Sequence, residues 1–429
     1  MSNYNFSEIS DACVKCGKCK PNCTIYKISH DEVKSPRGFL DLLGAYNRGE
    51  IELDKNLKDI FESCFLCTNC VQDCPVSLPT DTMIENARAD IAAKFGISWY
   101  KRLFFYLLRN RKIMDIAAKF GYVFQSCGFK IKDGNMSPRF SLPMLKKERL
   151  LPAASKKSFL NSHTEFIDNG SDKTIGIFIG CMGNYAYTAI GEGLLKILKE
   201  LKINAHLMKS QGCCSAPAYF TGDFNTVDYL AKKNIEYFES LLNSGKIEAI
   251  LIPEATCSAM IKVDYEHYFH NDPQWKQRAI NISKKIYLAT EYLAKFTNLA
   301  QILKERNRDK KLSKITYHDP CHARKMQGVW KEPRELLKHA YILNDMSDNH
   351  SCCGFGGVTM QSEKYHLSRQ AGQSRAAQID AMDAKCVGSE CSACKMQLNN
   401  ALHIYGSDTK CSNPIELIAN ALQKSLILF

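Results

Sequence analysis

The spacing of apolar residues divides the chain into a helical first part and a second part in which short strands alternate with helices. After the turn signal Ser35-Pro36, the apolar side chains recur at helical spacing, at Phe39, Leu42, Leu43 and Tyr46. A further helix is predicted to begin near Thr82, with Glu85 at the spacing of a capping box. The first hundred residues are therefore expected to form a small helical domain.

The middle of the chain has a different character. Residues 99–124 are basic, aromatic and amphipathic, which suits a helix packed in the core, a helix docked on a partner, or a helix lying on a membrane surface. Residues 130–173 are rich in Gly, Pro, Ser and Lys without a sustained period, which predicts a linker. Cys127 stands alone and is predicted to be a small buried apolar side chain.

The second half repeats itself. Each copy has a short apolar strand, a cysteine, a helix, a cysteine doublet, a second strand and a further cysteine. The two copies are 140 positions apart at Cys181 and Cys321, and 139 apart at Cys213 and Cys352. The strands are predicted at 175–179 and 249–252 in the first copy, and from 315 and at 385–387 in the second. The last helix is predicted to follow Asn413, with Pro414 and Glu416 completing its start signal.

Length and composition limit the classes of protein that fit. A chain of 429 residues is expected to form two or three domains. Twenty cysteines behind a polar, signal-free first segment favour a reducing compartment, and no apolar run is long enough to span a bilayer. The net charge of +12 is spread along the chain, which favours an acidic partner subunit or anionic lipid over nucleic acid.

Two cysteine runs near the start carry the clearest chemistry. Both read C-x2-C-x2-C-x3-C, the run that in two-cluster ferredoxins gives three thiolates to one [4Fe–4S] cluster and the fourth to the other. Because three closely spaced thiolates grip one face of a cubane, the fourth ligand of each cluster must come from the other run. The first cluster is assigned to Cys13, Cys16, Cys19 and Cys74, and the second to Cys64, Cys67, Cys70 and Cys23. Zinc and disulfides are the competing interpretations.

The repeats carry a second group of cysteines. The second copy contains Cys321, Cys352, Cys353, Cys391 and Cys394, and adjacent cysteines favour a cluster of several metal atoms or a free thiol beside a metal. The first copy contains Cys181, Cys213, Cys214 and Cys257. Met260 replaces the last cysteine of the first copy, and Ser215 replaces the glycine after its doublet, so this copy is degenerate. His318 and His322 flank Cys321 and are candidates for cofactor binding from the second coordination shell, as tuning or proton-relay groups, or for holding a turn.

These motifs together resemble a known family. The two cysteine runs, SPRGFLDLL, TYHDPCH, SCCGFGG and the NPIEL stretch at 413–417 are similar to the iron–sulfur subunit of glycolate oxidase, the corresponding subunit of anaerobic glycerol-3-phosphate dehydrogenase and the lactate-utilisation iron–sulfur proteins. The resemblance implies an α-helical ferredoxin domain followed by two pseudo-repeated α/β cysteine-rich (CCG) units. The expected divisions are the ferredoxin domain at 1–98, a helical segment and linker at 99–172, the first, degenerate CCG unit at 173–310 and the second CCG unit at 311–429.

The resemblance also implies a function. It predicts an electron-transfer subunit of a 2-hydroxyacid dehydrogenase complex, with two [4Fe–4S] clusters, a third cluster or zinc in the CCG units, and FAD or FMN only in a flavoprotein partner. No G-x-G-x-x-G dinucleotide fingerprint is present. The acceptor would be quinone or another carrier, and the location would be the cytoplasm or the cytoplasmic face of the inner membrane. The alternatives are a heterodisulfide-reductase-like thiol–disulfide enzyme, a membrane-anchoring carrier like that of glycerol-3-phosphate dehydrogenase, and a zinc-bound scaffold.

Overall fold

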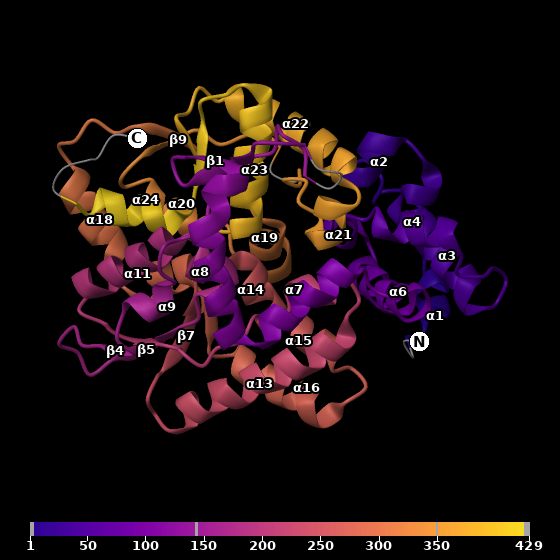
Figure 1. Ribbon diagram of the computed structural model, residues 1–429, viewed down its shortest axis with the longest axis horizontal. Helices are drawn as coiled ribbons and strands as arrows, with labels where there is room; N and C mark the ends of the chain where they lie inside the picture. Colours follow the sequence, from indigo (N-terminus) through magenta and orange to yellow (C-terminus); the bar gives the residue numbers. More distant parts are fainter. Residues whose placement is uncertain (1–3, 142–144, 349–350, 424–429) are drawn as a thin grey trace.

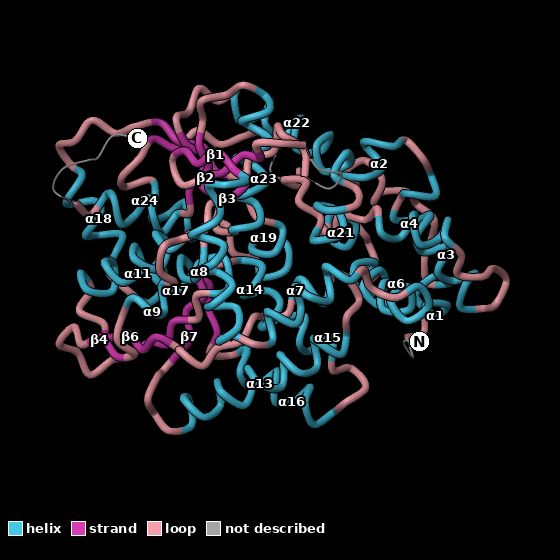
Figure 2. The backbone as a smooth tube through the Cα atoms, viewed as in Figure 1, coloured by secondary structure: helices cyan, strands magenta, loops and turns pink. Residues whose placement is uncertain are grey.

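The computed structural model describes residues 4–141, 145–348 and 351–423. Figure 1 shows the first hundred residues at one end of the molecule, in indigo, and the rest of the chain beside them. Strands are confined to the larger part, as Figure 2 shows. The predicted order of a helical region followed by two α/β units is what the structure shows.

The first region is built of short helices around one apolar core. Its elements are α1 (Phe6–Asp11), α2 (Thr24–Ser29), the 3₁₀ helix η1 (Glu32–Lys34), α3 (Pro36–Asn47), α4 (Lys55–Glu62), α5 (Asn69–Asp73) and α6 (Thr80–Phe95). Helix α3 starts as predicted, because the Ser35 side chain accepts a hydrogen bond from the N–H of Gly38 and Pro36 occupies the first turn. Phe39, Leu43 and Phe61 form part of the buried core.

The predicted capping box at Thr82 and Glu85 is wrong. Helix α6 already begins at Thr80, after Pro79, and no side chain caps it. Thr82 and Glu85 lie inside the helix and are buried. Glu85 faces Tyr219 of the first CCG unit, so it serves the packing between regions and not the start of its helix.

The segment at 99–124 forms two helices, α7 (Trp99–Arg109) and α8 (Arg111–Gly128), which meet at Asn110. Figure 1 shows α8 running across the front of the larger part. The predicted linker behind it contains a small antiparallel sheet of β1 (Phe129–Lys132), β2 (Asn135–Pro138) and β3 (Leu151–Pro152). Asp133 and Gly134 both adopt positive φ between β1 and β2, which is the Asp-Gly hairpin turn. The linker prediction was therefore wrong over these residues.

The first CCG unit has a five-stranded sheet in the order β4-β6-β5-β7-β8, parallel except for β4. Its strands are β4 (Phe166–Ile167), β5 (Thr174–Ile177), β6 (Asn204–Leu207), β7 (Ala249–Ile252) and β8 (Ile286–Leu288). Its helices are α9 (Phe159–Ser162), α10 (Gly180–Tyr185), α11 (Thr188–Glu200), α12 (Ala216–Tyr219), α13 (Phe224–Asn243), α14 (Ala255–Ala259), the π-helix η2 (Met260–Asp264), α15 (Tyr265–Tyr268), α16 (Pro273–Ser283), α17 (Ala289–Phe296) and α18 (Leu299–Asn307). Strands β6 and β7 are buried on both faces, as parallel strands usually are.

The second CCG unit has a four-stranded parallel sheet in the order β10-β9-β11-β12. Its strands are β9 (Lys314–Tyr317), β10 (Ile342–Leu343), β11 (Cys386–Gly388) and β12 (Lys410–Ser412). Its helices are α19 (Cys321–Gln327), α20 (Lys331–Leu337), α21 (Gly357–Ser362), α22 (Tyr365–Asp380), α23 (Ser392–Tyr405) and α24 (Pro414–Ala421). This order repeats β6-β5-β7-β8 of the first unit, so the predicted repeat is present in the fold.

The two units exchange helices near their C-terminal ends. Helix α24 of the second unit packs on α11 of the first, and α17 of the first packs on α20 of the second. The approach at Gly193 of α11 is close, because a Cβ there would lie 3.2 Å from the carbonyl oxygen of Ile415. Within the second unit, Tyr341 donates a hydrogen bond to the carbonyl of Leu417 and so holds α24. This exchange fixes the two units against each other, and with them their cysteines.

Replacing Asn413 should weaken this exchange. Asn413 caps α24 in a complete capping box with Glu416, and its side-chain amide also donates to the carbonyl of Pro253 in the first unit. Asn413→Ala is expected to lower the free energy of unfolding by about 1–2 kcal/mol, measured by urea denaturation. Asn298→Ala is the matched control, since Asn298 precedes α18 without a side-chain capping bond. Equal effects of the two substitutions would contradict the prediction.

Candidate metal centres

The cysteines of the two N-terminal runs gather around two small neighbouring cavities. One cavity is lined by Cys23, Cys64, Cys67 and Cys70. The other is lined by Cys13, Cys16, Cys19 and Cys74, and Cys70 reaches its edge as well. Each cavity thus brings three cysteines of one run together with the last cysteine of the other run. This is the grouping that the crossed-ligand hypothesis requires, and the assignment of ligands to clusters remains our proposal.

The backbone between these cysteines is shaped alike in both runs. Lys15 and Gly17 flank Cys16 at positive φ, and Leu66 and Thr68 flank Cys67 in the same way, 51 positions later. Left-handed conformations cost free energy for residues other than glycine, so the surrounding fold must hold Leu66 and Thr68 there. Alternation of right- and left-handed residues turns successive backbone N–H groups toward a common centre, which suits an anionic group.

The donor set of these cavities fits iron–sulfur clusters. Each cavity holds the four thiols of one assigned set beside apolar side chains, and the cavity of Cys64 is also lined by Thr24, Thr68, Asn69, Thr80 and Asp81. Burial raises the pKa of Cys23 and Cys70, and the sulfurs of neighbouring cysteines add to that rise. Thiols gathered this closely repel one another as thiolates, so they need a bound cation or cluster to become stable ligands.

The five cysteines of the second CCG unit converge from three loops. Cys321 opens α19, Cys352 and Cys353 lie in the loop before α21, and Cys391 and Cys394 lie at the start of α23. All five are buried. The Cys391 sulfur accepts a hydrogen bond from the N–H of Cys394 and lies 3.3 Å from the Thr256 hydroxyl of the first unit. The structure therefore brings together every cysteine that the sequence assigned to this centre.

The first CCG unit assembles its four cysteines in the same way. Cys213 interacts with both Cys181 and Cys214, and Cys214 interacts with Cys257, so the four sulfurs form one group. Ser215 adopts the left-handed conformation that Gly354 adopts after the other doublet, at φ +74° and +85°. Met260 is fully buried on η2, one turn after Cys257. The loop geometry is thus kept in this unit although its last thiol is missing.

A cavity of about 470 Å³ joins these groups. Its wall contains Cys181, Cys214 and Cys257 of the first unit and all five cysteines of the second. Cys67 of the N-terminal region also lines it. A hydrogen bond with Cys352 holds the pKa of the Cys67 thiol well below its usual value. Three sets of cysteines from three parts of the chain therefore meet around one cavity, an arrangement that the sequence did not reveal.

Lys325 lies between two of these sets and was missed by sequence reasoning. Its ammonium donates to the carbonyl of Cys67, to the side chain of Asn69 and to the sulfur of Cys321, the last over 3.7 Å. Burial lowers the pKa of Lys325, but the sulfurs of Cys321 and Cys67 outweigh this and raise it. A lysine four positions after a helix-starting cysteine was a signal, because such residues share a helix face.

The two candidate histidines differ in surroundings. His318 follows β9 and is fully buried, and its Nδ1 accepts a hydrogen bond from the Arg375 guanidinium. His322 lies on α19 against the ring of Phe220 and lines the cavity. Burial lowers the pKa of His322 to about 4, so its ring is neutral at pH 7. Asp319 forms the ion pairs of this turn, with Arg324 and Arg334.

The hairpin of α7 and α8 presents a large apolar face to solvent. Its exposed side chains are Trp99, Leu103, Tyr106, Ile113, Ile116, Phe120, Val123 and Phe124. Cys127 is exposed at the end of α8, so the prediction that it is buried was wrong. Within the ranges that the structure describes, no helix is long and apolar enough to cross a membrane.

Comparison with known protein families agrees with this division of the chain. Residues 9–78 match the family described as 4Fe-4S dicluster domain. Residues 175–262 and 315–399 match the family described as cysteine-rich domain, CCG. The chain thus carries one dicluster domain and two CCG domains.

Three relatives illustrate the proteins to which the chain is similar, two over nearly its whole length and one over 57% of it. A probable glycolate oxidase iron-sulfur subunit of Bacillus subtilis is 26% identical over 93% of this chain and 90% of its own length. One subunit of a fumarate reductase (CoM/CoB) of Methanothermobacter marburgensis is 25% identical over 97% of this chain and 73% of its own length. Lactate utilization protein A of Bacillus subtilis is 26% identical over 57% of this chain and 98% of its own length.

Proposed function

We propose that this chain is an iron–sulfur subunit of an oxidoreductase complex and carries electrons from a partner to an acceptor. The proposal starts from its combination of a 4Fe–4S dicluster domain with two CCG domains. Iron–sulfur clusters accept and release single electrons, and this is the chemistry that the bound groups would supply. The cysteines described above would hold two [4Fe–4S] clusters in the N-terminal region and a third cluster in the second CCG unit.

The observation that supports this proposal most is the contact between Cys67 and Cys352. One cysteine belongs to the second N-terminal set and the other to the CCG set. They line the same cavity, and their interaction is the largest cause of the lowered pKa of Cys67. Residues of the two regions are also tied together by Lys325, and by Arg88, which donates to the carbonyls of Cys64 and Phe220. The protein therefore holds the two sets close together and in a fixed geometry, as electron transfer between them requires.

The cavity suits an apolar acceptor. Besides cysteines, its wall carries Phe65, Phe104, Phe220, Phe355 and Val358, with Tyr100 and Lys101 toward α7. The ammonium and the guanidinium there are already paired, Lys101 with Glu363 and Arg149 with Gln361. A strongly anionic acceptor would find no free cation among these wall residues, whereas the ring of a quinone would find apolar contacts. We propose quinone as the acceptor class.

The electron donor is proposed from the relatives. Their names include glycolate oxidase and lactate utilization, and both glycolate and lactate are 2-hydroxy acids. Oxidation of such an alcohol removes two electrons, usually as hydride to flavin or nicotinamide. This chain carries no dinucleotide fingerprint, so the proposed donor is a flavoprotein subunit that holds FAD or FMN.

Filling the cavity tests the acceptor. Val358 lines it from α21, and Val358→Trp would place an indole in the space proposed for the quinone ring. Stopped-flow oxidation of the reduced protein by a short-chain quinone should slow by roughly tenfold or more, equivalent to about 1.4 kcal/mol. Iron content should not change. Val358→Ala is the control that keeps the space open, and an unchanged rate in Val358→Trp would rule out this cavity.

A thiol–disulfide reaction is the second candidate. It is favoured by the cysteines of both CCG units on one cavity wall and by the relative named for CoM and CoB. The buried Met260 argues against it, because the first unit then lacks the full set of thiols. Reduction of a disulfide substrate by the reduced protein, without quinone reduction, would establish this function and exclude the first.

The α7–α8 hairpin is proposed to contact an anionic membrane surface. Its exposed apolar side chains lie beside exposed Lys112 and Lys119, and α7 also borders the cavity through Tyr100 and Phe104. Each basic residue near such a surface contributes about 1 kcal/mol. Lys112→Gln/Lys119→Gln should therefore weaken binding to phosphatidylglycerol vesicles by roughly thirtyfold in a flotation assay.

The control for this prediction changes the same charge elsewhere. Lys196 and Lys199 are exposed on α11, so Lys196→Gln/Lys199→Gln should leave vesicle binding within about twofold of the wild type. Loss of flavoprotein association without loss of vesicle binding would assign the hairpin to the partner subunit instead.

A further inference from the structure

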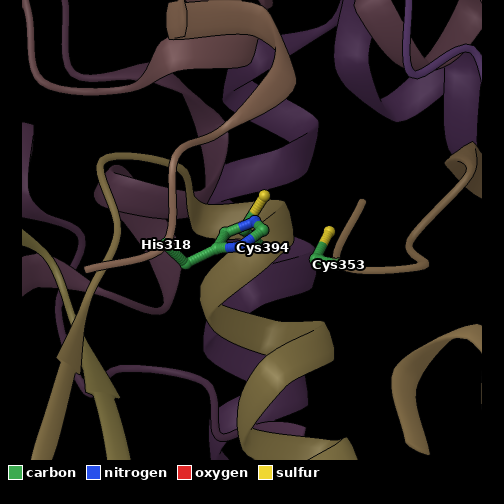
Figure 3. Close-up of side chains that lie close together, drawn as sticks. All are labelled: His318, Cys353 and Cys394. Carbon is green, nitrogen blue, oxygen red and sulfur yellow. The ribbon is translucent and has the colours of Figure 1, made fainter. Parts of the chain in front are cut away.

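Three side chains of the second CCG unit form a compact group that resembles a metal site. The ligand atoms of His318, Cys353 and Cys394 all lie within 4.8 Å of one another, and all three residues are buried. Figure 3 shows the imidazole of His318 beside Cys394 at the start of α23, with Cys353 approaching from a separate loop. Two thiols and an imidazole can bind a metal ion, so the protonation of the imidazole decides what this group does.

The hydrogen bond from Arg375 determines which nitrogen of His318 carries the proton. The Nε–H of Arg375 donates to Nδ1 of His318 over 3.1 Å. A guanidinium can donate hydrogen bonds but cannot accept them, and it stays protonated in proteins. Nδ1 must therefore offer its lone pair, and a neutral imidazole then carries its proton on Nε2. A nitrogen that carries a proton has no lone pair for a metal.

Arg375 lies on α22 and is itself held in place by hydrogen bonds. It is 1% exposed, and its Nη1 donates to the carbonyl of Asp348 and to the side chain of Gln378. The contact with His318 is thus a fixed feature of the packing. Nε2 of His318 is buried and makes no hydrogen bond of full geometry among the described residues, and Cys353 is the cysteine with which His318 interacts. A buried N–H donor without an acceptor costs free energy, so this nitrogen needs an acceptor that the site supplies when its cysteines are ionised.

The first CCG unit offers a natural comparison. Phe178 stands 140 positions before His318, the same interval that separates Cys181 from Cys321. Phe178 is also fully buried. The equivalent position of the first unit therefore carries no hydrogen-bond donor, and the two cysteine centres differ in this respect as well as in their last ligand.

We propose that His318 is not a metal ligand but donates its Nε2–H to the sulfur of Cys353, and that Arg375 is the positioning residue that enforces this tautomer. The proposal rests on the function proposed above in one respect: the hydrogen bond would tune a cluster bound in the second unit. Hydrogen bonds to cluster sulfurs stabilise the more negative, reduced state. His318 therefore raises the reduction potential of the second CCG centre relative to that of a site without a donor.

The tautomer can be read directly. The full chain, labelled with ¹⁵N-histidine and kept oxidised, should give for His318 the two-bond ¹H–¹⁵N pattern of an Nε2-protonated ring. The signal is assigned by its absence in His318→Phe, a substitution that the first unit already contains at the matching position. A pattern of Nδ1 protonation, or a metal-shifted Nε2, would overturn the proposal. This readout does not require the third cluster, so a failure of this proposal can be told apart from a failure of the proposed function.

Two further measurements separate a hydrogen bond from a structural role. His318→Phe should keep the iron content but lower the midpoint potential of the second CCG centre in an EPR-monitored titration, with the N-terminal clusters unchanged. Arg375→Leu should allow the Nδ1 tautomer, and Zn²⁺ or Co²⁺ should then bind the protein lacking iron more tightly by tenfold or more. An unchanged potential in His318→Phe, or unchanged metal affinity in Arg375→Leu, would contradict the assigned roles.

Discussion

Cys74→Ser should remove the first N-terminal cluster and leave the second in place, with a loss of about four iron atoms. Cys74 lies at the cavity formed by Cys13, Cys16 and Cys19, and its own run otherwise surrounds the neighbouring cavity. Serine is a much poorer ligand for iron than a thiolate, so the cluster should be lost or become labile. Iron and sulfide analysis and EPR of the reduced protein measure this outcome.

The crossed ligation is tested by adding a second substitution. In the Cys74→Ser background, Cys13→Ser should remove no further iron, whereas Cys64→Ser should remove about four more atoms. If each run held its own cluster, the two double variants would behave in the opposite way. Cys127→Ser is the control, because Cys127 is exposed and lies outside both cavities. Full iron and unchanged signals in Cys74→Ser would show that the assignment is wrong.

Cys353→Ala should have the second large effect. Cys353 is buried at the centre of the second CCG group, where hydrogen bonds with Cys352 and Cys394 hold its pKa well below the usual value of a thiol. Loss of this thiolate is expected to remove about four iron atoms and to slow quinone reduction roughly tenfold or more, while dithionite still reduces the two N-terminal clusters. Cys386→Ala is the control for an effect of destabilisation alone, since Cys386 is equally buried but lies in β11, outside this cysteine group.

Local signals in the sequence predicted much of this fold. The start of α24 at Pro414, with Asn413 and Glu416 in a capping box, follows from residue types whose side chains bond the first turn. The strands predicted in both repeats are present as β5, β7, β9 and β11, which are short, largely apolar and mostly buried. Asp133-Gly134 carried the signal of a hairpin, and the low apolar content around it obscured the small sheet.

The features that sequence could not supply are those made by long-range packing. The exchange of α17 and α24 between the units depends on how two sheets meet, and no local pattern records it. The contact of Cys67 with Cys352 joins two cysteines that are far apart in the sequence. Arg375 lies in the middle of an ordinary helix, and only the folded structure shows that it faces His318. Both halves of the candidate site were visible in the sequence, but their meeting around one cavity was not.

The most direct test of the central claim is the iron, sulfide and zinc content of protein purified without oxygen, together with EPR of the reduced sample. The account predicts about twelve iron atoms and as many sulfides per chain, no zinc, and signals from three centres. About eight irons would confine the clusters to the N-terminal region. Little iron with stoichiometric zinc would contradict electron transfer and leave a zinc-bound scaffold.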